Sequence, residues 1–232
     1  MQEILERSHV AGRAVAPGPS ELRRLVERAA GEGTQPVPIA EAWASVEKVF
    51  GSTSEAPRID VDLTIEGAAR AVARIVEVAG TGAPIALATS RPASLLPMYL
   101  ALARLARISS GDVADLEDSG PLRVDGRTAR VVRWVDGVAV VSDGHDLCGT
   151  RGTEAPLEWL FLIPRPALVV ADGPYADAAL AAGIEVVAPA GLDHCSLAIG
   201  PSRDRHCLVI PMWTDRSPAD YRPLLEATLA RI

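Results

Sequence analysis

The chain has 232 residues, of which 48% are hydrophobic and 23% charged, a balance that excludes a disordered protein. Its formal net charge is -7 and its arginines are scattered, so we expect no nucleic-acid partner. A charged amino terminus and the lack of an apolar run of about 20 residues exclude a signal peptide and a membrane span, which predicts a cytoplasmic protein.

Two amphipathic segments near the amino terminus predict helices. Residues 20–33, SELRRLVERAAGEG, place Leu22, Leu25 and Val26 on one face, and residues 39–51, IAEAWASVEKVFG, repeat the pattern. Each segment ends in glycine, as helices often do. We therefore predict a single α/β domain over residues 1–232, with a small helical segment over 1–56 and an α/β core over 57–232.

Residues 59–108 predict a helix, a strand and a second helix. The stretch IDVDLTIEGAARAVARIVEVAG, from Ile59, predicts a helix with Asp62 or Thr64 as its N-cap. PIALAT, residues 84–89, predicts a buried strand, and Pro92 suits the first turn of the helix that follows.

The second half of the chain predicts a hairpin and then alternating strands and helices. Asp136-Gly137 joins two β-rich runs, which predicts an antiparallel edge pair. Beyond it the pattern predicts helices at 153–163, 174–183 and 217–232, and strands at 167–172, 184–189 and 207–212. This alternation predicts a mostly parallel, doubly wound sheet with helices on both faces and a central β-hairpin.

Polar residues follow the apolar strands at five places, where a doubly wound sheet binds its ligands. These segments begin at Thr89, Ser142, Asp172, Ala190 and Trp213. If the strand order brings three of them together, carboxylates, imidazoles and arginines share one site. Each also has a purely structural alternative: Asp172 can cap a turn or helix, Arg91 can be a solvated side chain, and His145 and His194 can be loop or packing histidines.

Several common signatures are absent from the sequence. It holds no glycine-rich nucleotide loop ending in Gly-Lys-Ser/Thr, no Gly-x-Gly-x-x-Gly after the first strand and no Gly-x-Ser-x-Gly. The three cysteines lack metal-ligand spacing. These absences speak against nucleotide-driven chemistry, an α/β-hydrolase and a zinc ribbon.

Several segments in this order resemble an actinobacterial family generally labelled "phosphatase", whose members are α/β proteins of about this size. They are RSHVAGRAVAP, RIDVDLTIEG, ATSRPASLL, GTRGTEAP, VVADGPYADAALAAGIEVV, LAIG and VIPM. The resemblance implies that five positions keep the family's pattern: Thr89, Pro92, Thr150, Glu154 and Asp172.

Arg91 and Arg151 stand where the resemblance leads us to expect histidine. A neutral imidazole ligates metals and moves protons near neutral pH, whereas a guanidinium stays charged and does neither. The resemblance therefore implies that these two positions clamp phosphate or carboxylate oxygens.

These observations leave three functions open. The first is a phosphomonoester hydrolase for a small, anionic phosphorylated metabolite. In it, Arg91 and Arg151 hold the phosphoryl oxygens, Asp172 and Glu154 hold a candidate Mg²⁺ ion or position water, and His194 or His145 protonates the leaving oxygen. The remaining expected substrate contacts are Thr89, Ser90, Thr150, Asp193 and Tyr175.

The second function is a repurposed lyase, isomerase or cyclase of a specialised biosynthetic pathway, which binds a carboxylated or phosphorylated substrate through its arginines. The third is a non-catalytic binding protein. A homodimer is expected from base rates alone. The sequence leaves the substrate, a bound metal and the oligomeric state open.

Overall fold

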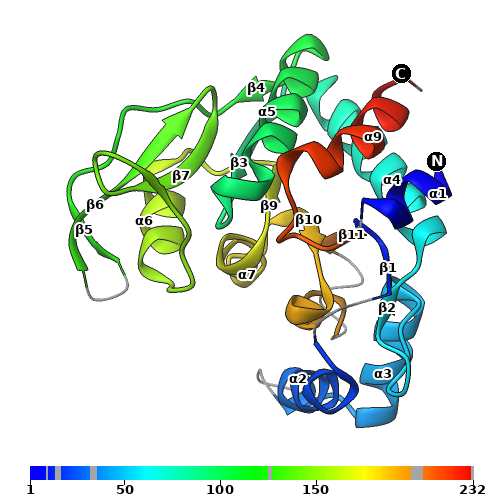
Figure 1. Cartoon of the computed structure of the whole chain (residues 1–232). Helices are drawn as coiled ribbons and strands as arrows, with labels where there is room; N and C mark the ends of the chain where they lie inside the picture. The colour runs from blue at the N-terminus through cyan, green and yellow to red at the C-terminus, as the bar shows by residue number, and fades with distance from the viewer. Residues whose placement is uncertain (9, 14–16, 32–35, 125–126, 200–205, 231–232) are drawn as a thin grey trace.

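The computed structural model describes residues 1–8, 10–13, 17–31, 36–124, 127–199 and 206–230. Within these residues the predicted α/β fold is confirmed: nine strands form one mixed sheet with helices on both faces (Figure 1). No helix in the described ranges is long and apolar enough to cross a bilayer. Residues 32–33 and 231–232 of the predicted helices, and parts of the RSHVAGRAVAP and LAIG segments, lie outside the described residues.

Parallel strands form the centre of the sheet in the order β7-β3-β9-β10-β11. Their bounds are β3 (Pro84–Ala88), β7 (Val138–Ser142), β9 (Leu168–Ala171), β10 (Glu185–Ala190) and β11 (Cys207–Pro211). Numbered along the chain, this is the order 2-1-3-4-5 of doubly wound sheets. The chain moves from β3 outward to β7 and then returns to the other side of β3 as β9. The topological switch point therefore lies between β3 and β9.

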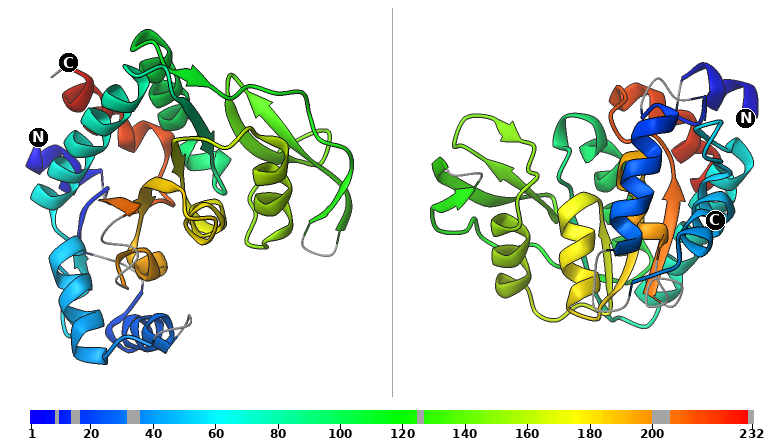
Figure 2. Two further views of the ribbon diagram at one scale, coloured as in Figure 1. Left: turned by 180° about the vertical axis from the view of Figure 1, so that it is seen from behind. Right: turned by 90° about the horizontal axis from the view of Figure 1, so that it is seen from below.

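Helices cover both faces of this sheet, as its apolar strands require (Figures 1 and 2). One face is covered by α4 (Val61–Ala79), α5 (Pro92–Ile108) and α9 (Pro218–Leu229). The other is covered by α6 (Glu154–Leu162), α7 (Gly173–Ala181) and the 3₁₀ helix η1 (Leu192–Ala198). The central strands are thus buried between two helical layers.

The amino-terminal segment is helical, as predicted, and contacts both helical layers: α1 (Gln2–Arg7) packs against α4 and α9, and the two later helices pack against η1. The segment consists of α1, α2 (Pro19–Gly31) and α3 (Ile39–Phe50), with a small antiparallel pair of β1 (Gly12–Arg13) and β2 (Arg58–Ile59). Helices α2 and α3 pack against each other and against η1 (Figure 1). The connection after β10 is therefore supported from two sides.

The N-cap predicted for α4 is wrong. Asp60 caps the helix, and its Oδ1 accepts hydrogen bonds from the backbone N–H of Asp62 at 2.9 Å and of Leu63 at 3.3 Å. The Thr64 hydroxyl instead donates to the Pro211 carbonyl at 2.6 Å. Asp60 directly follows β2, so the helix begins earlier than its apolar pattern indicates.

The hairpin at Asp136-Gly137 is confirmed, but its position as an edge pair is wrong. Both turn residues have positive φ, and β6 (Arg127–Val135) pairs antiparallel with β7. However, β7 also pairs with β3, and β5 (Leu122–Val124) extends the sheet beyond β6. The short strands β4 (Asp112–Val113) and β8 (Leu147–Cys148) add to β3 and β7, and are too short to show periodicity in the sequence.

Candidate active site

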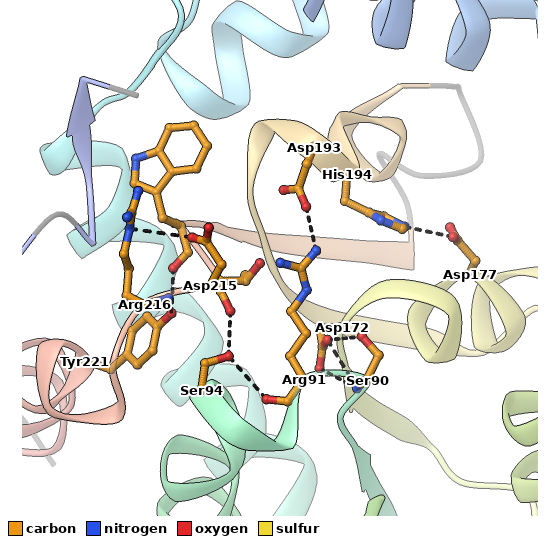
Figure 3. A network of polar contacts seen from close by, with 12 residues as sticks. Ser90, Arg91, Ser94, Asp172, Asp177, Asp193, His194, Asp215, Arg216 and Tyr221 are labelled. Carbon is orange, nitrogen blue, oxygen red and sulfur yellow. Dashed lines mark hydrogen bonds and ion pairs between the residues drawn. The ribbon is translucent and has the colours of Figure 1, made fainter. Parts of the chain in front are cut away.

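The residues that follow β3 and β9 meet at the switch point. The two strands are parallel neighbours, with Ala88 opposite Ala171, so the chain leaves both at the same edge of the sheet. Residues 89–91 lead from β3 into α5, and Asp172 leads from β9 into α7. Figure 3 shows the side chains of Ser90 and Asp172 directed toward each other across this junction.

Asp172 is 1% exposed and stands at the N-cap position of α7, yet its side chain makes no capping hydrogen bond. Its carboxylate instead accepts from Ser90: the backbone N–H is 3.3 Å from both oxygens, and the hydroxyl donates to Oδ2 at 2.5 Å. Hydrogen bonds to a charged group contribute about 1.5–3 kcal/mol. The structural alternative, in which Asp172 caps the helix, is therefore wrong.

Gly173 allows the start of α7 to pass close to Ser90. Its φ is +55°, a left-handed conformation that side chains rarely adopt. A Cβ atom added at this position would lie 2.7 Å from Ser90 Oγ, well inside van der Waals contact. Glycine at this position therefore keeps the space in which the Ser90 hydroxyl meets Asp172.

Arg91 extends the contact to the connection after β10. Its Nη2 donates to Asp193 Oδ2 at 2.5 Å, and the two side chains are 33% and 42% exposed. Burial acts to lower the pKa of Arg91, but the charges of Asp193, Asp172 and Asp215 outweigh it and raise that pKa. The guanidinium therefore lies among carboxylates that follow three neighbouring strands, and Arg91 is not simply a solvated side chain. We call Ser90, Arg91, Asp172 and Asp193 the switch-point cluster.

Three residues near the switch-point cluster have buried hydroxyl groups without hydrogen-bond partners in the described structure. They are Tyr99 on α5, Tyr175 on α7 and Thr150. Burial and the Asp172 carboxylate raise the pKa of both tyrosines, and the Tyr99 hydroxyl faces that carboxylate without the geometry of a regular hydrogen bond. Because an unpaired buried hydroxyl costs about 1–3 kcal/mol, this grouping is typical of a binding site.

Thr150 reaches the cluster through its backbone. Its N–H donates to the Ser90 carbonyl at 3.2 Å, and its residue surface is 4% exposed. Thr89 also belongs to this junction: its hydroxyl accepts from the Arg91 N–H at 3.1 Å, and its own N–H donates to the Ala139 carbonyl. Both residues therefore fix the backbone on either side of Ser90.

His194 lies beside Asp193 in η1 but faces another partner. Its Nε2 is 2.9 Å from Asp177 Oδ2 on α7, and Figure 3 shows the imidazole turned toward Asp177. Across the site, the Ser94 hydroxyl donates to the Thr214 carbonyl at 2.8 Å and ties α5 to the connection after β11. The described polar contact of the His194 ring is thus with α7 and not with the cluster.

Three other predicted site residues are exposed and make no described bond to the cluster. His145 is exposed in the turn after β7, where its N–H donates to Asp143 Oδ1 at 3.1 Å. Arg151 and Glu154 are exposed before and at the start of α6. Within the described ranges, no hydrogen bond or ion pair joins these three side chains to the switch-point cluster.

The predicted Mg²⁺ ligands are also separated in their contacts: Asp172 is buried against Ser90, and Glu154 is exposed. Among the described residues, no group of three or more His, Cys, Asp or Glu side chains is arranged to hold a metal ion.

Tyr99 was not predicted as a site residue. It lies inside an apolar helix, and its sequence position gives no signal of a polar role.

A family model described as "Phosphatase" matches residues 41–232. The match covers most of the chain, includes the whole switch-point cluster and confirms the resemblance inferred from the sequence. No curated protein matches the chain.

Proposed function

The chain belongs to the Phosphatase family, and on that premise we propose that it hydrolyses the phosphomonoester of a small phosphorylated metabolite. One observation carries the proposal: at the topological switch point, the buried pair of Ser90 and Asp172 lies between the N-termini of two helices, with Arg91 directly beside it. Doubly wound sheets bind ligands at this point.

The start of α5 and the start of α7 supply positive potential for a phosphoryl group. Backbone N–H groups in the first turn of a helix have no partner within the helix and point toward a bound anion. Arg91 adds a full charge and five N–H donors, of which the described structure uses one side-chain donor for Asp193. The phosphoryl oxygens would therefore meet both helix dipoles and the guanidinium.

Asp172 is the proton acceptor in this proposal. Its carboxylate is buried, oriented by two donors of Ser90 and adjacent to the expected phosphoryl position. A positioned general base typically contributes about 10²–10⁴-fold to a reaction rate. The leaving oxygen departs on the side away from Asp172 and takes its proton from water.

Purified protein offered a panel of sugar and nucleoside phosphates, with and without Mg²⁺ or Mn²⁺, tests the proposal through release of inorganic phosphate. We expect Arg91→Gln to raise KM by at least about tenfold, because a charge-assisted hydrogen bond contributes about 1.5–3 kcal/mol. Arg222→Gln is the matched control, since Arg222 pairs with Glu226 on the exposed face of α9.

Failure of the folded protein to release phosphate from any ester would overturn the proposal. Circular dichroism and a cooperative thermal transition would verify the fold in that case. Tight binding of phosphate esters without release would instead support the lyase, isomerase or cyclase alternative.

A further inference from the structure

Ser90 is the side chain whose geometry goes beyond substrate binding. We infer that Ser90 is the nucleophile of the reaction and forms a phosphoserine intermediate, an inference that rests on the proposed phosphatase function. Asp172 acts on Ser90 as its base, and the hydrolysis is completed by water in a second step.

The distance between the two groups supports this role. Ser90 Oγ donates to Asp172 Oδ2 at 2.5 Å, within the range of O–H···O⁻ hydrogen bonds between a hydroxyl and a charged carboxylate. A nucleophile held in a hydrogen bond by its base is the arrangement on which covalent catalysis by serine depends. Ser90 also donates its backbone N–H to the same carboxylate, which fixes the hydroxyl relative to its base.

The surroundings of Ser90 favour attack on an anion. Ser90 directly precedes Arg91, the N-cap residue of α5, so the helix N-terminus follows it at once, and the Arg91 guanidinium is close enough to Asp172 for that carboxylate to raise the pKa of Arg91. The Thr150 hydroxyl is buried and has no partner in the described structure, and the backbone N–H of the same residue donates to the Ser90 carbonyl. The hydroxyl is a donor still available for a phosphoryl oxygen.

Gly173 gives an independent indication that the space around the hydroxyl matters. The backbone there has φ of +55°, and a Cβ atom would lie 2.7 Å from Ser90 Oγ. Even alanine would therefore displace the hydroxyl from its base. If the hydrogen bond from Ser90 served only to satisfy the buried Asp172 carboxylate, the unpaired hydroxyls of nearby residues would have no explanation.

Hydrolysis through Ser90 takes two successive displacements at phosphorus. Ser90 Oγ attacks phosphorus, its proton passes to Asp172, and the bond from phosphorus to the ester oxygen breaks. The released oxygen takes a proton from water on the opposite side. A water molecule then attacks the phosphoserine from that side and gives a proton to the hydroxide left by the first step, and the bond from phosphorus to Oγ breaks. Asp172 returns its proton to Oγ, so the products are an alcohol and inorganic phosphate.

Stereochemistry at phosphorus tests the inference directly, with a chiral, isotopically labelled form of an ester from the panel that the protein hydrolyses. Two successive in-line displacements give net retention, which we expect. Net inversion would show direct attack by water and would overturn the role of Ser90 while leaving the proposed function intact. If no ester is hydrolysed, both the proposed function and this inference fail.

Acid-quenched reactions identify the nucleophile. We expect one phosphoryl group on the peptide that contains Ser90, stable to hydroxylamine as a phosphoserine is. A hydroxylamine-labile label on Asp172 would assign the nucleophile to the carboxylate and overturn the inference. Ser90→Ala should lose the label and at least about 100-fold in kcat. Ser109→Ala, at the opposite end of α5, should keep the label; thermal unfolding of both variants checks that they fold.

Discussion

Site residues were predicted both at the switch-point cluster and in the segment of residues 143–154, where a polar turn with His145 follows an apolar strand and the family resemblance adds Arg151 and Glu154. In the cluster, the side chains bond to one another across the sheet. In the other segment, the predicted side chains of His145, Arg151 and Glu154 are exposed. Polar residues after a strand therefore indicate where that strand reaches the edge of the sheet. Side chains from different connections meet only where adjacent parallel strands end at the same level.

Strand register explains why the 143–154 segment behaves differently. β7 pairs with β3 through Val138 and Ala139, with Ala139 opposite Ala88, the last residue of β3. It then continues to Ser142, so the turn that carries His145 lies beyond the level at which β3 ends. β8 runs back antiparallel and returns the chain to Ser90 at Thr150. The described bond between this segment and the cluster is therefore a backbone one, from the Thr150 N–H to the Ser90 carbonyl.

The largest expected effect contrasts one carboxylate from each region. Asp172→Asn removes the proton acceptor but keeps its shape, and we expect kcat/KM to fall by about 10²–10⁴-fold. Glu154→Gln, on the exposed start of α6, should change kcat/KM by less than about threefold, since exposed positions away from a site contribute little. Steady-state kinetics measures both values, and an equal loss of kcat/KM in the two variants would show that Glu154 also belongs to the site.

Two glycines, one at the start of α7 and one just after its end, separate the effect of crowding at the cluster from that of backbone strain. Gly173 and Gly183 both have positive φ, but a Cβ atom at Gly183 would meet nothing within 4 Å. We expect Gly183→Ala to cost about 1–2 kcal/mol of unfolding free energy from strain alone and to keep activity. Gly173→Ala should cost more and also lower kcat, because it displaces the Ser90 hydroxyl.

Urea unfolding and initial rates, measured on both glycine variants, provide the check. A Gly173→Ala protein as active as the Gly183→Ala protein would show that the close approach to Ser90 has no catalytic consequence.

Titration of the tyrosine hydroxyls at alkaline pH tests whether the side chains around the switch point are buried. Burial raises the pKa of all three tyrosines, Tyr99, Tyr175 and Tyr221, above the ordinary value of 10.0, and Asp172 adds to the shift of the first two. Because the folded chain holds these protons more tightly, their contribution to stability is complete below pH 10.0 and is lost as pH rises through the raised pKa values.

We therefore expect the ultraviolet signal of tyrosinate to appear together with the loss of circular dichroism above pH 10.0, and near pH 10.0 in denaturant. A tyrosine that ionises near pH 10.0 while the fold is intact would contradict the burial of that side of the site.

The smallest expected effects belong to the 143–154 segment. His145→Ala and Arg151→Gln remove exposed side chains with no described contact to the cluster, so we expect kcat/KM within about threefold of the parent protein. The pH dependence of kcat/KM should also be unchanged in His145→Ala. A tenfold rise in KM for Arg151→Gln would show that this segment closes over the bound substrate.

Most helices and strands, and the edge of the sheet at which polar residues gather, could be predicted from the sequence. Helical and strand periodicities are local properties of the chain, so residues 39–51 and 84–89 indicated their structures without reference to distant residues. The Asp136-Gly137 turn and the polar residues after each strand were readable in the same way. Boundaries that depend on a neighbouring element, such as the N-cap at Asp60, were not.

Which polar residues contact one another depends on the tertiary structure. Ser90 and Asp172 are separated by 82 positions in sequence, and their hydrogen bond exists because the sheet places β9 beside β3. Strand order follows from the packing of helices against both faces and from long-range pairing, neither of which leaves a periodic signal in the chain. The register of β7 and β8 likewise depends on long-range pairing. It places the turn with His145 beyond the end of β3 and brings Thr150 back to Ser90.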